Sequence, residues 1–167
     1  IHNKKTVLQT VSILNSQNEF KITPENTKSG LLNVVKNTGL QGRWQQLNEF
    51  PKVICDTAHN KNGLEIVLNQ IQKEDFDTLH IVVRVVNDKD LDEILPLFPK
   101  KAIYYFCKPN IPRGLDVLIL KQKAATFELK GEVYNSVSEA YKRAIENAAK
   151  SDFIYIGGST FVVAEIL

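Results

Sequence analysis

Residues 53–72 read VICDTAHNKNGLEIVLNQIQ, and their pattern indicates the class of fold. Val53, Ile54 and Cys55 form a short apolar run, and residues 53–56 are predicted to be a short buried strand. After a polar loop, apolar residues at positions 64, 67, 68 and 71 follow the spacing of an amphipathic helix that runs from Gly63 to Gln72. The stretch therefore predicts a strand, a loop and a helix in immediate succession.

The same succession recurs toward the carboxyl end of the chain. β-branched and aromatic residues predict strands at 81–86, 102–107 and 153–156, with further strands at 42–47 and 133–134. Helical spacing or capping predicts helices at 90–97, 114–125, 136–149 and 160–167. Strands that alternate with helices of about ten residues indicate βαβ units. We therefore expect an α/β fold that is Rossmann-like, with a mostly parallel sheet and helices on both faces.

The amino-terminal residues predict helices without strands. Residues 6–14 have nearly helical apolar spacing, and Thr23 followed by Pro24 is typical of a helix start. That second helix is expected to end before Gly39, because glycine commonly follows the last turn of a helix. A boundary between two parts of the chain is therefore expected near residues 36–42.

Composition excludes several classes of function. The chain has 167 residues, of which 43% are hydrophobic, and this favours a globular domain. No apolar run approaches the ~20 residues of a membrane span, and a net charge of +2 without a basic block argues against a nucleic-acid surface. Cys55 and Cys107 lie in apolar strands and are interpreted as free buried thiols. The three histidines show no metal-ligand spacing, so no metal site is predicted in this chain.

Ligands of parallel sheets bind beyond the carboxyl ends of the strands, so the loops that follow the strands are the candidate site. Four polar loops qualify: DTAHN at 56–60, NDKD at 87–90, KPNIPR at 108–113 and GGST at 157–160. The chain contains no GxxxxGK[ST] phosphate-binding loop and no GxSxG nucleophile motif. We therefore assign no catalytic residue to this fragment, and its loops need groups from elsewhere for chemistry.

Each candidate residue has a functional and a structural interpretation. Asp56 is suited to a ribose, a metal-bound water or an ammonium group, and His59 to phosphate or carboxylate, but Asp56 can equally cap a turn and His59 can lie on the surface. Ser159 follows two glycines that permit close approach of a ligand, or it simply begins the last helix. Arg43 is a candidate for phosphate, and Arg113 in its proline-stiffened loop for carboxylate, although either is also compatible with a solvated surface position.

Taken in order, the motifs resemble a known family. They are Gly42-Arg43, Pro51, VICDTAHN at 53–60, VNDKD at 86–90, the PR pair at 112–113 and GGS at 157–159. This order resembles the C-terminal domain of folylpolyglutamate synthase/dihydrofolate synthase, within the Mur ligase family. The resemblance covers residues 30–167. Residues 1–29 resemble the last helix of the family's ATPase domain, followed by a linker, with Asn3 in the place of a residue that touches the nucleotide.

The resemblance implies a function and its partners. An N-terminal P-loop ATPase domain of the same polypeptide would bind ATP and Mg²⁺ and supply the Mg²⁺ ligands. A folate or dihydropteroate carboxylate would be phosphorylated and then attacked by L-glutamate. By position, Arg43 would contact the ATP phosphates and Asp56 the nucleotide, whereas His59, Ser159 and Arg113 would serve the glutamate. The resemblance further implies a cytoplasmic monomer, and this chain alone should be inactive.

The sequence departs from the family pattern at two positions, and two other classes of protein are compatible with the motifs. Arg84 stands where the family usually has glycine, which weakens the expectation of a close backbone approach there, and Gly114 stands where alanine is common. The C-terminal domain of a muramyl-peptide ligase shares the fold and the D-x-A-H segment. A non-catalytic nucleotide-binding or interaction module would have the same kind of sheet. Addition of the first glutamate, of later ones or of both is compatible with the motifs.

Overall fold

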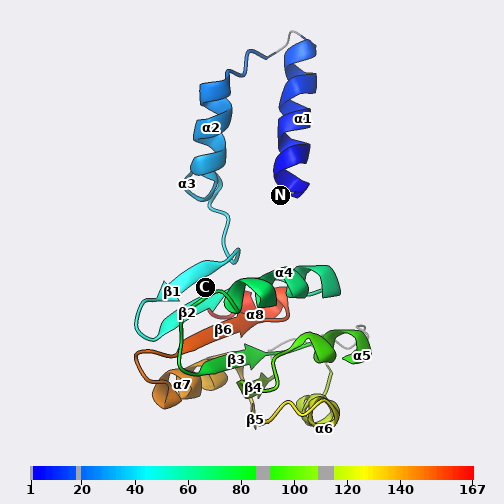
Figure 1. Ribbon diagram of the computed structural model, residues 1–167, viewed down its shortest axis with the longest axis vertical. Helices are drawn as coiled ribbons and strands as arrows, with labels where there is room; N and C mark the ends of the chain where they lie inside the picture. The colour runs from blue at the N-terminus through cyan, green and yellow to red at the C-terminus, as the bar shows by residue number, and fades with distance from the viewer. Residues whose placement is uncertain (1, 18–19, 86–90, 109–114) are drawn as a thin grey trace. The chain divides into compact units, whose positions relative to one another are not determined.

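The computed structural model describes residues 2–17, 20–85, 91–108 and 115–167 (Figure 1). It divides the chain into two compact units, Ile1–Gln41 and Gly42–Leu167, and each is described by itself. This division lies near the boundary expected at residues 36–42, and the domain bounds 1–29 and 30–167 that the resemblance implies stay predictions. The assignment of residues 1–29 to a preceding ATPase domain stays a prediction.

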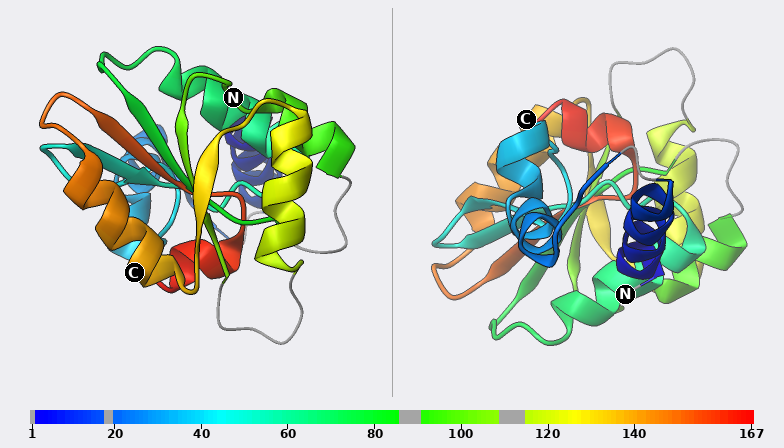
Figure 2. Two further views of the ribbon diagram at one scale, coloured as in Figure 1. Left: turned by 90° about the horizontal axis from the view of Figure 1, so that it is seen from below. Right: turned by 90° about the horizontal axis from the view of Figure 1, so that it is seen from above.

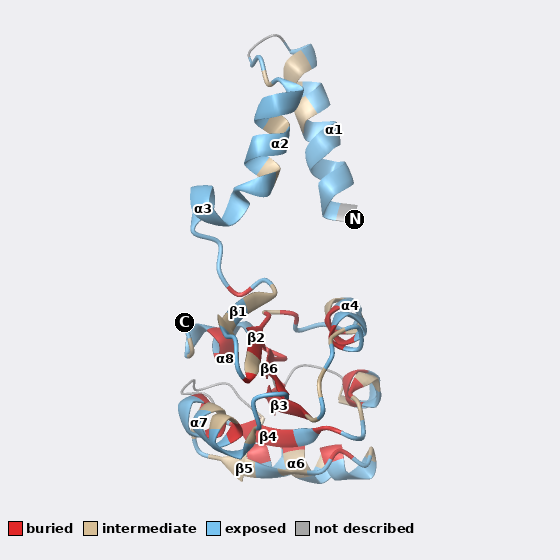
Figure 3. Ribbon diagram, turned by 60° about the vertical axis from the view of Figure 1, so that its left-hand side comes forward, coloured by how far each residue is buried: buried red, intermediate tan, exposed pale blue. Residues whose placement is uncertain are grey.

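The amino-terminal unit consists of helices α1 (His2–Ser16), α2 (Pro24–Leu32) and α3 (Val34–Thr38). Thr23 begins α2 as expected, because its side chain accepts a hydrogen bond from the Asn26 amide at 3.1 Å. Gly39 ends α3 with φ of 66°, a left-handed conformation that glycine adopts without strain. Neither α2 nor α3 contains a buried residue, and Figure 3 shows this unit mostly in the colour of exposed residues.

The second unit is built on a six-stranded sheet with the strand order β1-β2-β6-β3-β4-β5. The strands are β1 (Gln45–Asn48), β2 (Lys52–Cys55), β3 (Leu79–Val83), β4 (Ile103–Cys107), β5 (Gly131–Tyr134) and β6 (Phe153–Gly157). β1 pairs with β2 in the antiparallel direction, and every other neighbouring pair is parallel. β6, the last of these strands in the sequence, therefore lies between β2 and β3 near the centre of the sheet.

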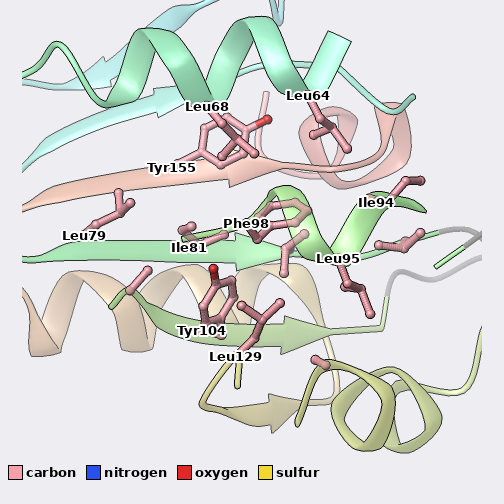
Figure 4. Packing of buried hydrophobic residues seen from close by; sticks show 14 of the residues in the cluster. Leu64, Leu68, Leu79, Ile81, Ile94, Leu95, Phe98, Tyr104, Leu129 and Tyr155 are labelled. Atoms are coloured by element: carbon pink, nitrogen blue, oxygen red, sulfur yellow. The ribbon is translucent and has the colours of Figure 1, made fainter. Parts of the chain in front are cut away.

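Alternating side chains of the strands form two hydrophobic cores, one on each face. One face carries α4 (Lys61–Ile71), α5 (Leu91–Ile94), the 3₁₀ turn η1 (Leu95–Leu97) and α6 (Val117–Thr126), and Figure 4 shows Leu64 and Leu68 of α4 packed near Tyr155 of β6. The other face carries α7 (Val137–Asn147) and α8 (Thr160–Ala164) (Figure 2). The expected α/β fold with a mostly parallel sheet and helices on both faces is confirmed.

A buried polar cluster lies near the amino ends of β3 and β6. His80 Nδ1 lies 2.9 Å from the Tyr105 hydroxyl, and His80 Nε2 lies 3.3 Å from Asp152 Oδ2. The Asp152 carboxylate also accepts hydrogen bonds from the amides of Ala149 and Thr78. Because each side chain has partners, the cluster stabilises the end of the sheet opposite the candidate site.

Candidate functional site

The carboxyl ends of β2, β6 and β3 bring the candidate residues to one edge of the sheet. The loop after β2 contains Asp56 and His59, and the loop after β6 contains Ser159. The turn before β1 contains Arg43, and this turn is hydrogen-bonded to the loop after β2 because the Thr57 amide donates to the Gly42 carbonyl at 2.9 Å. The structure therefore brings Arg43 and the Asp56–Asn60 loop together and places Ser159 on the same edge.

Asp56 is the buried acid of this edge, and both of its carboxylate oxygens are bonded to the backbone. Oδ2 accepts a hydrogen bond from the Trp44 amide, and Oδ1 accepts one from the Ala58 amide, each at 2.7 Å. Only 7% of the residue is exposed. The turn-capping interpretation of Asp56 thus describes its observed contacts, and its predicted contact with a nucleotide stays a prediction.

The turn that presents Arg43 has an unusual backbone on both sides of the arginine. Gly42 has φ of 68°, and Trp44 has φ of 45°, a left-handed value that costs energy for any residue except glycine. A Cβ atom on Gly42 would lie 2.8 Å from Thr57 Cγ2 and 2.8 Å from Val163 Cγ1, so only glycine fits there. Arg43 itself is exposed. The turn is therefore held tightly at its base, with its cation directed to solvent.

His59 is exposed, but its ring has a fixed partner. Nδ1 lies 3.0 Å from the Thr57 carbonyl oxygen. Because a carbonyl oxygen can only accept, Nδ1 must carry the hydrogen, and in the neutral ring Nε2 is then an acceptor. The next residue, Asn60, caps α4 through a hydrogen bond from the Gly63 amide. His59 therefore presents an acceptor nitrogen directly before the first turn of a helix.

Ser159 is nearly inaccessible and begins α8. Its hydroxyl accepts a hydrogen bond from the Phe161 amide at 3.2 Å, and 1% of the residue is exposed. The two preceding glycines are needed for packing, since a Cβ on Gly157 would lie 2.1 Å from the Tyr155 hydroxyl, and one on Gly158 would lie 2.7 Å from the Arg84 carbonyl oxygen. The helix-start interpretation describes this geometry, and contact of Ser159 with glutamate stays a prediction.

Arg84 is a buried cation at the end of β3. Only 1% of the residue is exposed, and burial lowers the pKa of its guanidinium, although electrostatic interaction with the nearby Cys107 and Glu165 side chains opposes that shift. The close backbone approach at this position is made possible by Gly158 in the loop after β6, whose missing side chain leaves room for the Arg84 carbonyl. The departure from the family pattern at position 84 is therefore compatible with tight packing of the two strands.

The remaining predicted residues lie outside this edge or outside the described residues. Asn3 is exposed in α1 of the amino-terminal unit, so its predicted nucleotide contact stays a prediction. Arg113, Gly114 and the DKD segment at 88–90 fall in 109–114 and 86–90, which the structure does not describe. Within the described ranges, no group of three or more His, Cys, Asp or Glu side chains could hold a metal ion. None of the helices in these ranges is long and apolar enough to cross a membrane.

Two residues of the site, Trp44 and Thr57, escaped the sequence analysis. Both donate hydrogen bonds through their backbone amides. Every residue except proline has such an N–H group, so the residue type does not indicate this role. Gly42 was a usable signal, because a glycine beside a candidate arginine is compatible with a left-handed turn.

Comparison with known proteins places the chain in a family. The model of the family described as Mur ligase, glutamate ligase domain, matches residues 42–160, which is more than half of the chain. The chain therefore belongs to the Mur ligase family and contains its glutamate ligase domain.

Particular relatives carry related names. The chain is 32% identical over 149 residues to the probable bifunctional folylpolyglutamate synthase/dihydropteroate synthase of Haloferax volcanii, covering 87% of this chain and 17% of that protein. It is 30% identical over 141 residues to the dihydrofolate synthase/folylpolyglutamate synthase of Buchnera aphidicola from Acyrthosiphon pisum, covering 80% of this chain and 32% of that protein.

A solved structure agrees with these matches. The bifunctional folylpolyglutamate synthase/dihydrofolate synthase of Yersinia pestis, complexed with AMPPNP and Mn ion, has a TM-score of 0.71 and 25% identity, covering 89% of this chain and 34% of that one. The chain thus spans about a third or less of the length of these relatives.

Proposed function

We propose that this chain is the C-terminal domain of an ATP-dependent ligase that adds L-glutamate to a carboxylate of a folate or dihydropteroate. The observation that carries the proposal is the set of hydrogen bonds that holds the Arg43 turn against the His59 loop at the carboxyl ends of the strands. Relatives with this domain are named folylpolyglutamate synthases, and one of them was solved with an ATP analogue and Mn ion.

The reaction would proceed in two steps. A carboxylate oxygen of the pterin substrate forms a bond to the γ-phosphorus of ATP, and the bond from that phosphorus to the leaving ADP oxygen breaks. The glutamate ammonium loses one proton, the amine nitrogen then forms a bond to the acyl carbon, the carbon–oxygen bond to phosphate breaks, and the nitrogen loses a second proton. Several anions meet in one cleft, so exposed cations and N–H donors are needed to offset their repulsion.

Residues of this chain would bind and position the substrates. Arg43 would contact the ATP phosphates, with Asp56 and Asn3 also belonging to the nucleotide site. His59 would accept a hydrogen bond from the glutamate ammonium through Nε2, since Nδ1 is bonded to Thr57. Ser159 would donate its hydroxyl hydrogen to a glutamate carboxylate, since the hydroxyl oxygen accepts from the Phe161 amide. Arg113 would hold the glutamate carboxylate.

Mg²⁺ would neutralise phosphate charge when bound, with its ligands supplied by an N-terminal P-loop ATPase domain of the same polypeptide. The residues that the structure describes suit this division of labour, since both Asp56 oxygens accept hydrogen bonds from backbone amides and no group of three or more His, Cys, Asp or Glu side chains among those residues could hold a metal ion. The domain would close on the nucleotide and complete the glutamate site. We further propose a monomer in the cytoplasm.

The test is an ADP-release assay on the full-length protein that contains this chain. With ATP and Mg²⁺, turnover should require L-glutamate together with dihydropteroate or a folate. Turnover with a muramyl-peptide precursor in place of the pterin would move the chain to the other branch of the family. Nucleotide binding without any glutamate-dependent ADP release would favour a binding module and contradict the proposal.

A further inference from the structure

We propose that Asp56 is a positioning residue that couples the nucleotide side of the site to the amino-acid side. The inference rests on the proposed function for the identity of the two ligands, but its geometric basis does not. Asp56 stands between the turn that carries Arg43 and the loop that carries His59, and its carboxylate has one oxygen bonded to each segment.

The first half of the coupling is the bond to the Arg43 turn. Trp44 has φ of 45°, and its amide donates to Asp56 Oδ2 at 2.7 Å. A non-glycine residue in this conformation persists only where its surroundings hold it, because the strain costs of order 1–3 kcal/mol. A short hydrogen bond to a buried carboxylate supplies that restraint, and Arg43 is the residue directly before the restrained one.

The second half is the bond to the His59 loop. The other oxygen, Oδ1, accepts from the Ala58 amide at 2.7 Å and so fixes the peptide that precedes His59. The flanking residue Thr57 repeats the arrangement, since its amide donates to Gly42 and its carbonyl accepts from His59 Nδ1. Displacement of either segment therefore strains the contacts of the other.

The carboxylate is suited to this role, and the role does not depend on whether Asp56 also contacts the nucleotide. With 7% of the residue exposed, each of its oxygens accepts a hydrogen bond from the backbone amide of a different segment. An ionised carboxylate offers two acceptor oxygens, whereas an amide of the same shape offers one acceptor and one donor. Asp56→Asn keeps the volume of the side chain but replaces one acceptor oxygen by an NH₂ donor. That donor would face one of the two backbone amides, so one hydrogen bond is lost.

The test compares Asp56→Asn with Asp116→Asn in the full-length protein. Asp116 is a matched control, because its Oδ1 also accepts from an amide two residues later at 2.7 Å, at the exposed start of α6. One lost hydrogen bond to a charged group should raise the KM values for ATP and for glutamate together, each by about tenfold or more, with a smaller change in kcat. Asp116→Asn should change neither.

Trp44 provides a readout that needs no ligase activity. It is the only tryptophan of the chain and lies half-buried, with its ring centroid 6.4 Å from that of Phe153. Release of the turn should shift its fluorescence emission to longer wavelength in Asp56→Asn and not in Asp116→Asn. Gly42→Ala, which forces the same turn away from Thr57 with Asp56 intact, should reproduce both the emission shift and the paired rise in KM.

The outcomes separate the proposals. A rise in KM for ATP alone, or unchanged KM values with only a lower melting temperature, would overturn the coupling role. Unchanged Trp44 emission would overturn it as well. If Asp56→Asn does not fold, amide exchange in the wild-type protein decides, since the amides of Trp44 and Ala58 must be protected. Absence of ligase turnover in the wild type would instead refute the proposed function and leave the fluorescence and exchange results to be judged by themselves.

Discussion

Arg43 combines an exposed side chain with a restrained backbone, and this combination suits a group that must meet a phosphate in a fixed place. Arg43→Ala in the full-length protein should raise the ATP concentration needed for half-maximal turnover far more than that of the pterin substrate. Loss of one charge-assisted phosphate contact costs about 1.5–3 kcal/mol, which is about a tenfold to hundredfold effect. Steady-state kinetics with each substrate varied in turn measures the difference.

The control for this prediction is Arg143→Ala. Arg143 is an exposed arginine of α7 that pairs with Glu146 at 3.0 Å, and a surface pair of this kind contributes little. It should leave both substrate requirements unchanged. An Arg43→Ala variant that folds correctly and keeps the wild-type dependence on ATP would rule out the phosphate contact.

His59 is the residue of the second prediction, because its two ring nitrogens have different roles: Nδ1 donates to Thr57, and Nε2 is the proposed acceptor for glutamate. His59→Ala should impair the use of glutamate and leave ATP binding intact. His59→Asn can replace Nδ1 as the donor to Thr57 but lacks the outward acceptor, whereas His59→Gln places a polar group near Nε2. We expect Gln to restore glutamate use and Asn not to, as measured by the KM for glutamate.

The three variants also report on mechanism. Recovery by Asn instead of Gln would show that the ring only holds the loop. If neither recovers and the wild-type rate follows the titration of a histidine, proton transfer is the role of His59. A change in ATP dependence alone would show that His59 serves the nucleotide and not, as proposed here, glutamate.

Among the secondary-structure elements, β3, β4 and the start of β6 are connected by the buried polar cluster of His80, Tyr105 and Asp152. This cluster makes the stability of the sheet dependent on pH in the acid range. Burial alone would raise the pKa of Asp152, but hydrogen bonds from Ala149, His80 and Thr78 outweigh that effect and hold the pKa below its usual value. A carboxyl whose folded-state pKa is lowered stabilises the fold above its unfolded pKa of about 3.9, and this stabilisation is lost as the pH falls through the lowered value.

Asp152→Asn should therefore reduce the free energy of unfolding at pH 7 by about 1.5–3 kcal/mol, the worth of hydrogen bonds to a charged group. The difference between the wild type and the variant should shrink as the pH is lowered from 5 to about 2. Urea unfolding at a series of pH values measures this. A difference that stays constant over that range would show that the charge of Asp152 does not contribute.

Most elements were predictable because their signals are local. Ser136 and Glu139 predicted the start of α7, where the Ser136 hydroxyl accepts from the Glu139 amide at 3.0 Å. The helix expected at 90–97 is divided, because α5 gives way to the 3₁₀ turn η1, which contains Pro96, and proline is poorly tolerated inside an α-helix. The position of β6 between β2 and β3 was not predictable, because strand order depends on contacts between residues about a hundred positions apart.

The candidate site was predictable in its location but not in its contacts. The rule that ligands bind beyond the carboxyl ends of parallel strands placed Asp56, His59 and Ser159 at one edge. The choice between capping and ligand binding for Asp56 depends on the distant amide of Trp44, which no local pattern reveals. The burial of Arg84 is a similar case, since one arginine within a run of β-branched residues fits either an edge strand or a central one.

At the scale of the whole molecule, the chain should fold without catalysing the ligase reaction. The sequence contains no GxxxxGK[ST] loop, and the chain spans about a third or less of its relatives. Mixed with ATP, Mg²⁺, glutamate and dihydropteroate, it should release no ADP above the buffer rate while showing a cooperative unfolding transition. Glutamate-dependent turnover at a rate comparable to the full-length protein would contradict this expectation.

The central position of β6 has a consequence for biosynthesis. A ribosome makes β1 to β5 before Phe153 to Gly157, so until those last residues leave the exit tunnel, β2 and β3 both present unpaired edges. A nascent chain that ends shortly before Phe153 lacks the central strand β6 rather than an edge strand. Such truncated products should be prone to aggregation and dependent on chaperones, whereas loss of the marginal β1 segment would leave the parallel part of the sheet continuous.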